Sequence, residues 1–507
     1  MAAPTLSSVS PSQGPSSGGA TVTLTGTGFT GATAVRFGTT AAASFIVTSS
    51  TQITAVTPPG TGAVNVTVTT SQGTSTQTVT YTYVTAPVLS SLAPTQGPTV
   101  GGTTVTLTGT NLTGATAVRF DATAATSFTV NSPTQITAVT PAHAAGAAAV
   151  TVTTPGGTSN AQTYTYAAVP VLSSLAPTQG PTAGGTTVTL TGTNLTGATA
   201  VRFDATAATS FTVNSPTQIT AVTPAHAAGA AAVTVTTPGG TSNAQTYTYA
   251  AVPVLSSLAP TQGPTAGGTT VTLTGTNLTG ATAVRFDATA ATSITVNSPT
   301  QITAVTPAHA AGAAAVTVTT PGGTSNPDNP VAYFFYATAP SATNIAPSSG
   351  TVAGGTTVIL TGSGFINATA VRFDATAATS FTVNSPSQIT AVTPAHAAGA
   401  AAVTVTTPGG TSNALDYFYL AAPTLTSLTP SQGPASGGSV IALTGTNLTT
   451  TTSVLFGGTP ATFTVLSPTQ VTALPPAGAA GAVTVTVATA AGVSNGLTYT
   501  RIAAPAI

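Results

Sequence analysis

The chain has 507 residues, of which 41% are hydrophobic and only 2% are charged. Its six basic residues are all Arg and its six acidic residues are all Asp, so the net charge is zero and no basic surface is available for nucleic acid or an anionic membrane. Cysteine is absent, which excludes disulfides and thiolate metal sites, and no apolar run reaches the roughly 18 residues that a transmembrane helix needs.

An internal repeat dominates the sequence. A proline that precedes an alternating segment recurs at intervals of 83, 83, 83, 87 and 83 residues. These prolines are Pro4, Pro87, Pro170, Pro253, Pro340 and Pro423. The spacing predicts modules 1 to 6 at residues 1–84, 85–167, 168–250, 251–337, 338–420 and 421–502, the fourth with a four-residue insertion near 327–330. We interpret residues 503–507 as a linker or as the start of a further module.

Within module 2, the alternation of apolar and polar residues between Gly and Pro punctuation predicts seven strands and no helix. In chain order the expected strands are residues 87–94, 103–112, 117–121, 126–131, 135–141, 147–154 and 161–166. Val105 and Leu107 alternate with threonines, as in a sheet with one buried face. Tyr164 and Tyr166 share one face of the last strand and should close the end of a sandwich. The predicted fold is all-β, with six tandem immunoglobulin-like β-sandwich modules of about 83 residues in an elongated array.

Glycines and asparagines mark the predicted turns. Gly97, Gly101 and Gly102 stand where a positive φ or a close backbone approach would exclude a side chain, and residues 155–157 indicate a tight hairpin. A phosphate-binding loop is the alternative for such glycines, but no helix follows to supply its dipole. Glycosylation sequons begin at Asn65, Asn111, Asn194, Asn277, Asn367 and Asn447. The simpler interpretation is an Asn that tolerates left-handed geometry at a strand end.

Each module carries a version of the same motifs. In module 2 they are residues 92–98 (Leu-Ala-Pro-Thr-Gln-Gly-Pro), 101–112 (Gly-Gly-Thr-Thr-Val-Thr-Leu-Thr-Gly-Thr-Asn-Leu), 155–160 (Pro-Gly-Gly-Thr-Ser-Asn) and a Tyr-Thr-Tyr ending. This set resembles the IPT/TIG domain, the immunoglobulin-like fold shared by plexins and some transcription factors. The resemblance implies that fold in all six modules and a bacterial surface or phage-type array, but no single function. The basic loops with which transcription-factor members contact DNA have no counterpart here.

One histidine recurs in the loop Pro-Ala-His-Ala-Ala-Gly of modules 2 to 5. The four residues are His143, His226, His309 and His396. A metal site needs several converging ligands, which one His per module does not supply, so we expect no metal and no cofactor. The predicted role is an exposed loop residue copied by duplication, and the alternative is a contact between modules or chains.

An Arg and an Asp recur two residues apart in the same modules. The pairs are Arg119 and Asp121, Arg202 and Asp204, Arg285 and Asp287, and Arg372 and Asp374. Residues two apart share one face of a strand, so we expect surface ion pairs, with an inter-module or inter-chain contact as the alternative. About one Asp per module, no Glu and no recognisable nucleophile motif predict no catalytic residue and no enzyme.

Modules 2 to 5 are near-copies, whereas modules 1 and 6 have Phe-Gly in place of Phe-Asp and no His. Linkers such as residues 167–170 leave almost no slack, so the joints should be semi-rigid. We therefore expect a non-enzymatic structural protein, either an extracellular stalk or spacer or a self-associating fibre, whose partner is itself or a cell-surface protein or glycan. The alternatives are an adhesin or carbohydrate-binding array, and a decoration or tail protein of a phage or injection particle. We expect it at the cell surface or outside the cell, although no leader precedes module 1; a virion component is the alternative.

Overall fold

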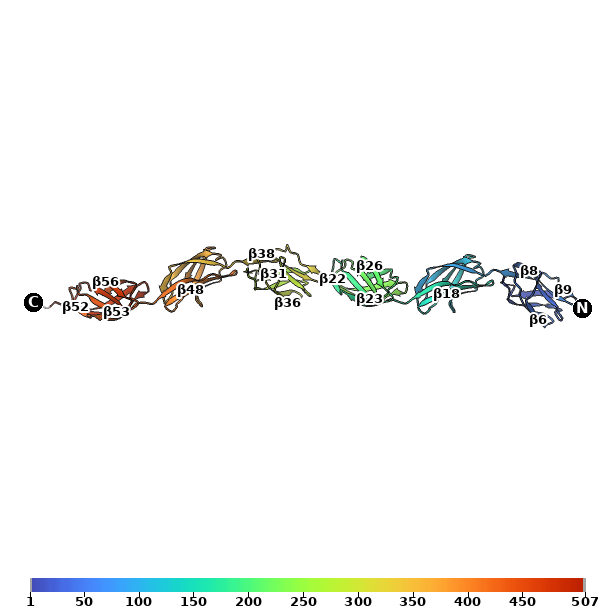
Figure 1. The fold of residues 1–507 in the computed structure, drawn as a ribbon, viewed down its shortest axis with the longest axis horizontal. Helices are drawn as coiled ribbons and strands as arrows, with labels where there is room; N and C mark the ends of the chain where they lie inside the picture. The colour runs from blue at the N-terminus through green and yellow to red at the C-terminus, as the bar shows by residue number, and fades with distance from the viewer. Residues whose placement is uncertain (1, 505–507) are drawn as a thin grey trace. The chain divides into compact units, whose positions relative to one another are not determined.

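The computed structural model describes residues 2–504, and these residues form β-strands without a helix. The chain divides into two units, residues 1–251 and 252–507, which hold modules 1 to 3 and modules 4 to 6 respectively. Figure 1 colours the modules from blue for module 1 to red for module 6. The predicted start of a further module falls on residues 503–507, of which 505–507 lie outside the described residues.

Each module repeats the same ten strands. In module 2 they are β11 (Val88–Ala93), β12 (Gln96–Pro98), β13 (Thr104–Thr110), β14 (Ala117–Phe120), β15 (Thr123–Ala124), β16 (Ser127–Ser132), β17 (Gln135–Val139), β18 (Gly146–Thr154), β19 (Gly157–Thr158) and β20 (Gln162–Ala167). The corresponding series run from β1 (Thr5–Ser10) to β10 (Thr80–Val84), β21 (Val171–Ala176) to β30 (Gln245–Ala250), β31 (Val254–Ala259) to β40 (Tyr333–Ala337), β41 (Ser341–Ala346) to β50 (Leu415–Leu420), and β51 (Thr424–Thr429) to β60 (Leu497–Ile502).

Two sheets pack face to face in each module. In module 2 a four-stranded sheet has the order β11-β13-β17-β16, and a six-stranded sheet has the order β12-β20-β18-β14-β15 with β19 beside β18. All pairings are antiparallel except that of β12 with β20, where Gly97 lies opposite Tyr166. The prediction of six tandem immunoglobulin-like sandwiches is confirmed. The seven-strand prediction missed β12, β15 and β19, because strands of two or three residues are too short to show alternation.

The core of module 2 lies between the two sheets and includes three aromatic rings in mutual contact. Val105, Leu107 and Tyr164 are fully buried, and Tyr166 is 1% exposed. The ring of Tyr164 makes edge contacts with Phe120 at 5.5 Å and with Tyr166 at 5.0 Å between centroids. Such pairs add to the burial of apolar area, and the role of the two tyrosines in closing the end of the sandwich stays a prediction.

The predicted turn residues adopt the expected geometry. Gly101 and Gly102 have φ values of 73° and 82°, and a Cβ at Gly97 would overlap the Tyr164 hydroxyl. Asn111 has a φ of 59°, and the four later sequon asparagines lie within 2° of this value. Asn65, by contrast, lies inside β8 (Gly62–Thr70), so the left-handed interpretation is wrong for that residue.

The insertion in module 4 lies between β39 (Gly323–Thr324) and β40. In module 2, the Asn160 side chain accepts from the backbone N–H of Leu89 and donates to its carbonyl, both at 2.9 Å. In module 4, Asn329 from the insertion donates to the Leu255 carbonyl at 2.7 Å. The longer loop therefore keeps an amide contact with the first strand of its module. Residues 2–504 include no helix with the length and hydropathy of a bilayer-crossing segment.

Candidate functional site

The recurrent Asp and His side chains meet inside each of modules 2 to 5. Asp121 follows β14 in the left-handed conformation with a φ of 50°, and His143 lies in the loop between β17 and β18. Oδ2 of Asp121 is 3.2 Å from Nε2 of His143, and Oδ1 accepts a 2.8 Å hydrogen bond from the backbone N–H of Ala149. The same contact, at 3.1 to 3.2 Å, joins His226 to Asp204, His309 to Asp287 and His396 to Asp374.

The imidazole of His143 also packs against the core. Its ring stacks on Tyr166 with centroids 4.8 Å apart and planes 23° apart, and its side chain is only 21% exposed. Nδ1 lies 2.9 Å from the carbonyl oxygen of Ala144, so both ring nitrogens face oxygen acceptors. The prediction of an exposed loop residue is therefore wrong, because stacking holds the ring against the sandwich. We call Asp121, His143 and Tyr166, with their equivalents in modules 3 to 5, the Asp–His–Tyr cluster.

Burial sets the acidity of the tyrosine in this cluster. Burial raises the pKa of Tyr166 to about 12, and the neighbouring Tyr164 and Asp121 add to the increase. The equivalent tyrosines Tyr249, Tyr336 and Tyr419 also have pKa values raised to about 12, with burial as the first cause. A phenol of this kind stays neutral at ordinary pH and offers no base for catalysis.

The predicted ion pair between Arg119 and Asp121 does not form. Nη1 of Arg119 donates instead to the carbonyl oxygen of Ala122 at 2.8 Å, and the positive φ of Asp121 takes its side chain off the strand face. Arg202, Arg285 and Arg372 make the same bond to the turn that follows their strand. Among residues 2–504, the salt bridges are the four His–Asp contacts. An inter-module or inter-chain role for these residues stays a prediction.

A sequence signal for the His–Asp contact does exist. Modules 1 and 6 have Gly38 and Gly457 at the Asp position, and Gly60 and Gly478 at the His position. The Asp and the His are therefore either both present in a module, as in modules 2 to 5, or both absent, as in modules 1 and 6. Where both are absent, a Cβ at Gly60 would overlap the ring of Tyr83, which leaves no space for a side chain at that position.

Each joint between modules is held by the module that follows it. Nδ2 of Asn111 donates to the carbonyl oxygen of Ala86 at 3.1 Å, and a Cβ at Gly156 would overlap the carbonyl oxygen of Thr85. The same amide bond, at 3.0 to 3.1 Å, joins Asn194 to Val169, Asn277 to Val252 and Asn447 to Ala422. Gly239 and Gly409 pack in the same way on the carbonyls of Ala168 and Thr338. We call the Asn amide and the Gly together the linker clamp.

Two aromatic side chains face solvent. Phe335 on β40 is 52% exposed and Phe418 on β50 is 49% exposed, and both occupy the position of Thr165 on β20. Phe335 lies opposite Gln262 and Ala313 on the neighbouring strands of its sheet. These outward rings distinguish modules 4 and 5 from their near-copies.

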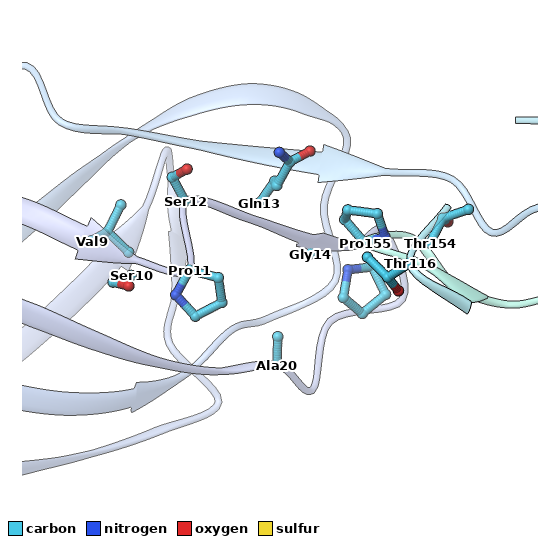
Figure 2. A pocket seen from close by; sticks show the side chains of 11 residues that line it. Val9, Ser10, Pro11, Ser12, Gln13, Gly14, Ala20, Thr116, Thr154 and Pro155 are labelled. Carbon is cyan, nitrogen blue, oxygen red and sulfur yellow. The ribbon is translucent and has the colours of Figure 1, made fainter. Parts of the chain in front are cut away.

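A hollow in the first unit is lined by residues 9–15 and 20 of module 1 and by Thr116, Thr154 and Pro155 of module 2 (Figure 2). Its lining contains hydroxyls, prolines and one glutamine but no ionisable side chain. Within the described residues, no three His, Cys, Asp or Glu side chains gather as a metal site.

Comparison with solved structures gives low overall similarity. The plexin A4 full extracellular region is 16% identical, with 97% of this chain and 55% of that chain covered and a TM-score of 0.28. Invasin, a bacterial integrin-binding protein, is 18% identical, with 66% and 79% covered and a TM-score of 0.22. SGBP-B from a xyloglucan utilization locus in Bacteroides uniformis is 21% identical, with 38% and 57% covered and a TM-score of 0.18. This chain thus spans about half the length of the plexin A4 ectodomain.

No curated protein sequence matches the chain. The family model described as the IPT/TIG domain matches six stretches, which are residues 4–83, 87–166, 170–249, 253–333, 340–419 and 423–500. These stretches cover nearly the whole sequence and contain the motifs that suggested the resemblance. The chain therefore belongs to the IPT/TIG domain family, of which it contains six tandem copies.

Proposed function

We propose that the chain is a non-enzymatic spacer at the cell surface or outside the cell, a stalk whose length is set by the number of its modules. The observation that carries this proposal is the linker clamp. In modules 2, 3, 4 and 6 an Asn amide binds the backbone just ahead of the module's first strand, and in modules 2, 3 and 5 a glycine packs closely against that backbone.

The clamp opposes bending at a joint in two ways. Only residues 168–170 separate β20 from β21, so a change of direction must move backbone that Asn194 and Gly239 hold. Loss of the amide bond to the Val169 carbonyl costs about 1 kcal/mol. Proline at position 170 further restricts the linker. These terms favour a stiff joint over a flexible tether.

The near-identity of modules 2 to 5 supports a role in which length matters. A binding surface would need only one copy, whereas a spacer gains reach from each added module. The neutral exterior also offers little charge repulsion against side-by-side packing, which supports self-association into a fibre as one form of this role.

A module deletion tests the spacer directly. Removal of residues 168–250 should lower the maximum dimension measured by small-angle X-ray scattering by one module length, roughly 35–40 Å for strands of about ten residues plus loops. Electron microscopy of the same two proteins provides an independent length. An unchanged maximum dimension would show that the modules fold back on one another, and it would contradict the proposal.

A second candidate function, an adhesin or carbohydrate-binding array, is favoured by the outward rings of Phe335 and Phe418. Flat aromatic faces stack on apolar surfaces of ligands, and Thr is the residue at the same position in modules 2 and 3. Binding to a glycan array by the unaltered chain, lost in the Phe335→Thr and Phe418→Thr double variant, would support it. The matched control is Ile359→Thr, which replaces an exposed apolar residue of β43 (Thr357–Ser363) in the other sheet of module 5.

A further inference from the structure

Arg501 occupies an unusual position for a charged residue. It lies on β60 at the place that Tyr166 takes on β20, because each pairs with one glycine of the parallel neighbour and one glycine of the antiparallel neighbour. The side chain is 7% exposed, which makes Arg501 the one charged residue classed as buried among residues 2–504. An arginine has thus replaced a core tyrosine at the end of module 6.

The contacts of this guanidinium are incomplete. Nη2 donates to the carbonyl oxygen of Pro476 at 3.1 Å, whereas Nε is buried and has no hydrogen-bond partner. The group lies against Gly478, where a Cβ would overlap Nη1. Modules 2 to 5 have His at the position of Gly478. In module 6 the guanidinium of Arg501 therefore occupies the space that the imidazole fills in those modules.

The counter-ion is missing from the same module. Residues 421–502 contain no Asp, Glu or His, and Gly457 stands where modules 2 to 5 have the Asp of the Asp–His–Tyr cluster. In the part of the chain that the structure describes, every salt bridge is a His–Asp contact and none involves Arg501. The buried cation of module 6 therefore lacks the carboxylate that its sister modules provide.

We propose that Arg501 is the centre of an oxyanion-binding site at the end of module 6, and that its ligand is a carboxylate from outside the module. A buried cation without a partner is strongly unfavourable, so an anion that reaches it is bound with a large gain. Guanidinium is the group best suited to carboxylate, because its fork of N–H donors matches the two oxygens.

The small number of arginines allows a direct test on the full chain. Six arginines give six Nε–H resonances in an arginine-selective nitrogen-15 spectrum, and substitution Arg501→Tyr, which restores the residue of modules 2 to 5, identifies the one of interest. Titration with sodium acetate against sodium chloride at equal ionic strength should shift the Arg501 resonance along a saturating curve. The resonances of Arg36 and Arg119, whose guanidinium groups already donate to a turn carbonyl, should stay in place.

A dilution series separates two sources of the carboxylate. If a side chain or terminus of a second copy provides the carboxylate, the chemical shift of Arg501 depends on protein concentration, and acetate competes with the second copy for the site. If free carboxylates are the ligands, this chemical shift depends on acetate concentration alone. Either result supports the site. The proposal would be overturned if the chemical shift of the Arg501 resonance changed with neither acetate nor protein concentration. It would also be overturned if that shift changed no more than the shifts of the other five resonances. Should Arg501→Tyr fail to fold, single Arg→Gln substitutions at positions 36, 119, 202, 285 and 372 assign the other five resonances and identify that of Arg501 by elimination.

Discussion

Nε2 of His143 and Oδ2 of Asp121 lie 3.2 Å apart and join the loop after β17 to the turn after β14. Because the same carboxylate accepts from the backbone of Ala149 on β18, one Asp side chain connects the turn after β14, the loop between β17 and β18, and β18 itself. The contact recurs in four successive modules, so it is a constant feature of their structure.

Loss of the imidazole should therefore weaken module 2. We expect His143→Ala to lower the free energy of unfolding of this module by about 1–2 kcal/mol, since it removes both the stacking on Tyr166 and the contact with Asp121. Hydrogen exchange of residues 144–154 measures the effect. Arg119→Gln is the matched control and should cost less than ~1 kcal/mol, because its guanidinium bonds only a turn carbonyl. Equal effects of the two substitutions would contradict the assignment.

Gly97 in β12 and Gly102 in the segment before β13 should differ sharply in their tolerance of a methyl group. Gly97→Ala drives a Cβ into the Tyr164 hydroxyl and should destabilise module 2 by about 2 kcal/mol or more. Gly102→Ala meets no atom within 4 Å and should cost only about 1 kcal/mol of left-handed strain, since φ is 82°. Pulse proteolysis in urea compares the two variants, and a larger loss in Gly102→Ala would be inconsistent with the packing described.

The tyrosine of the Asp–His–Tyr cluster in modules 2 to 5 predicts loss of stability in alkali. Tyr166 has a folded-state pKa of about 12, against an unfolded value of about 10. Between these values the unfolded chain releases the proton and the folded chain retains it, so stability is complete below about pH 10 and falls as pH rises towards 12. Tyrosinate absorbance and circular dichroism, recorded together, should change in one step. Ionisation of these tyrosines near pH 10 in a fully folded chain would refute the prediction.

The linker clamp predicts where a protease gains access. Gly239→Val should push the Ala168 carbonyl away and increase the rate of cleavage within residues 167–170. Gly240→Val is the control, because φ at Gly240 is 118° and a Cβ there meets nothing within 4 Å, so it strains the hairpin without touching the linker. Limited proteolysis with mass spectrometry distinguishes them. Equal linker cleavage in both variants would remove the role of close packing at Gly239.

The sequence predicted most of the fold but not the pairing of its charges. Alternation places Val105 and Leu107 inside, and the glycine and asparagine turns follow from backbone conformation alone. The spacing of Arg119 and Asp121 suggested a partnership that a positive φ at Asp121 prevents. Its true partner, His143, comes from a distant loop, and such contacts depend on tertiary structure that alternation does not encode.

The aromatic and cationic exceptions were also hidden in the pattern. Phe335 occupies an outward position of a strand that elsewhere carries Thr, and only the register of β40 shows that it faces solvent. Arg501 looks like a surface residue by type, and its burial follows from its alignment with Tyr166. Both become visible when the modules are compared position by position.

The stiffness of a single joint tests the spacer most directly. Because the chain has no cysteine, Thr129→Cys and Thr212→Cys, at equivalent exposed sites on β16 and β26 (Ser210–Ser215), accept two spin labels without other changes. Double electron–electron resonance should give one narrow distance distribution between modules 2 and 3, and Asn194→Ala with Gly239→Val should broaden it. A distribution in the clamped chain as broad as that of the double variant would contradict the spacer.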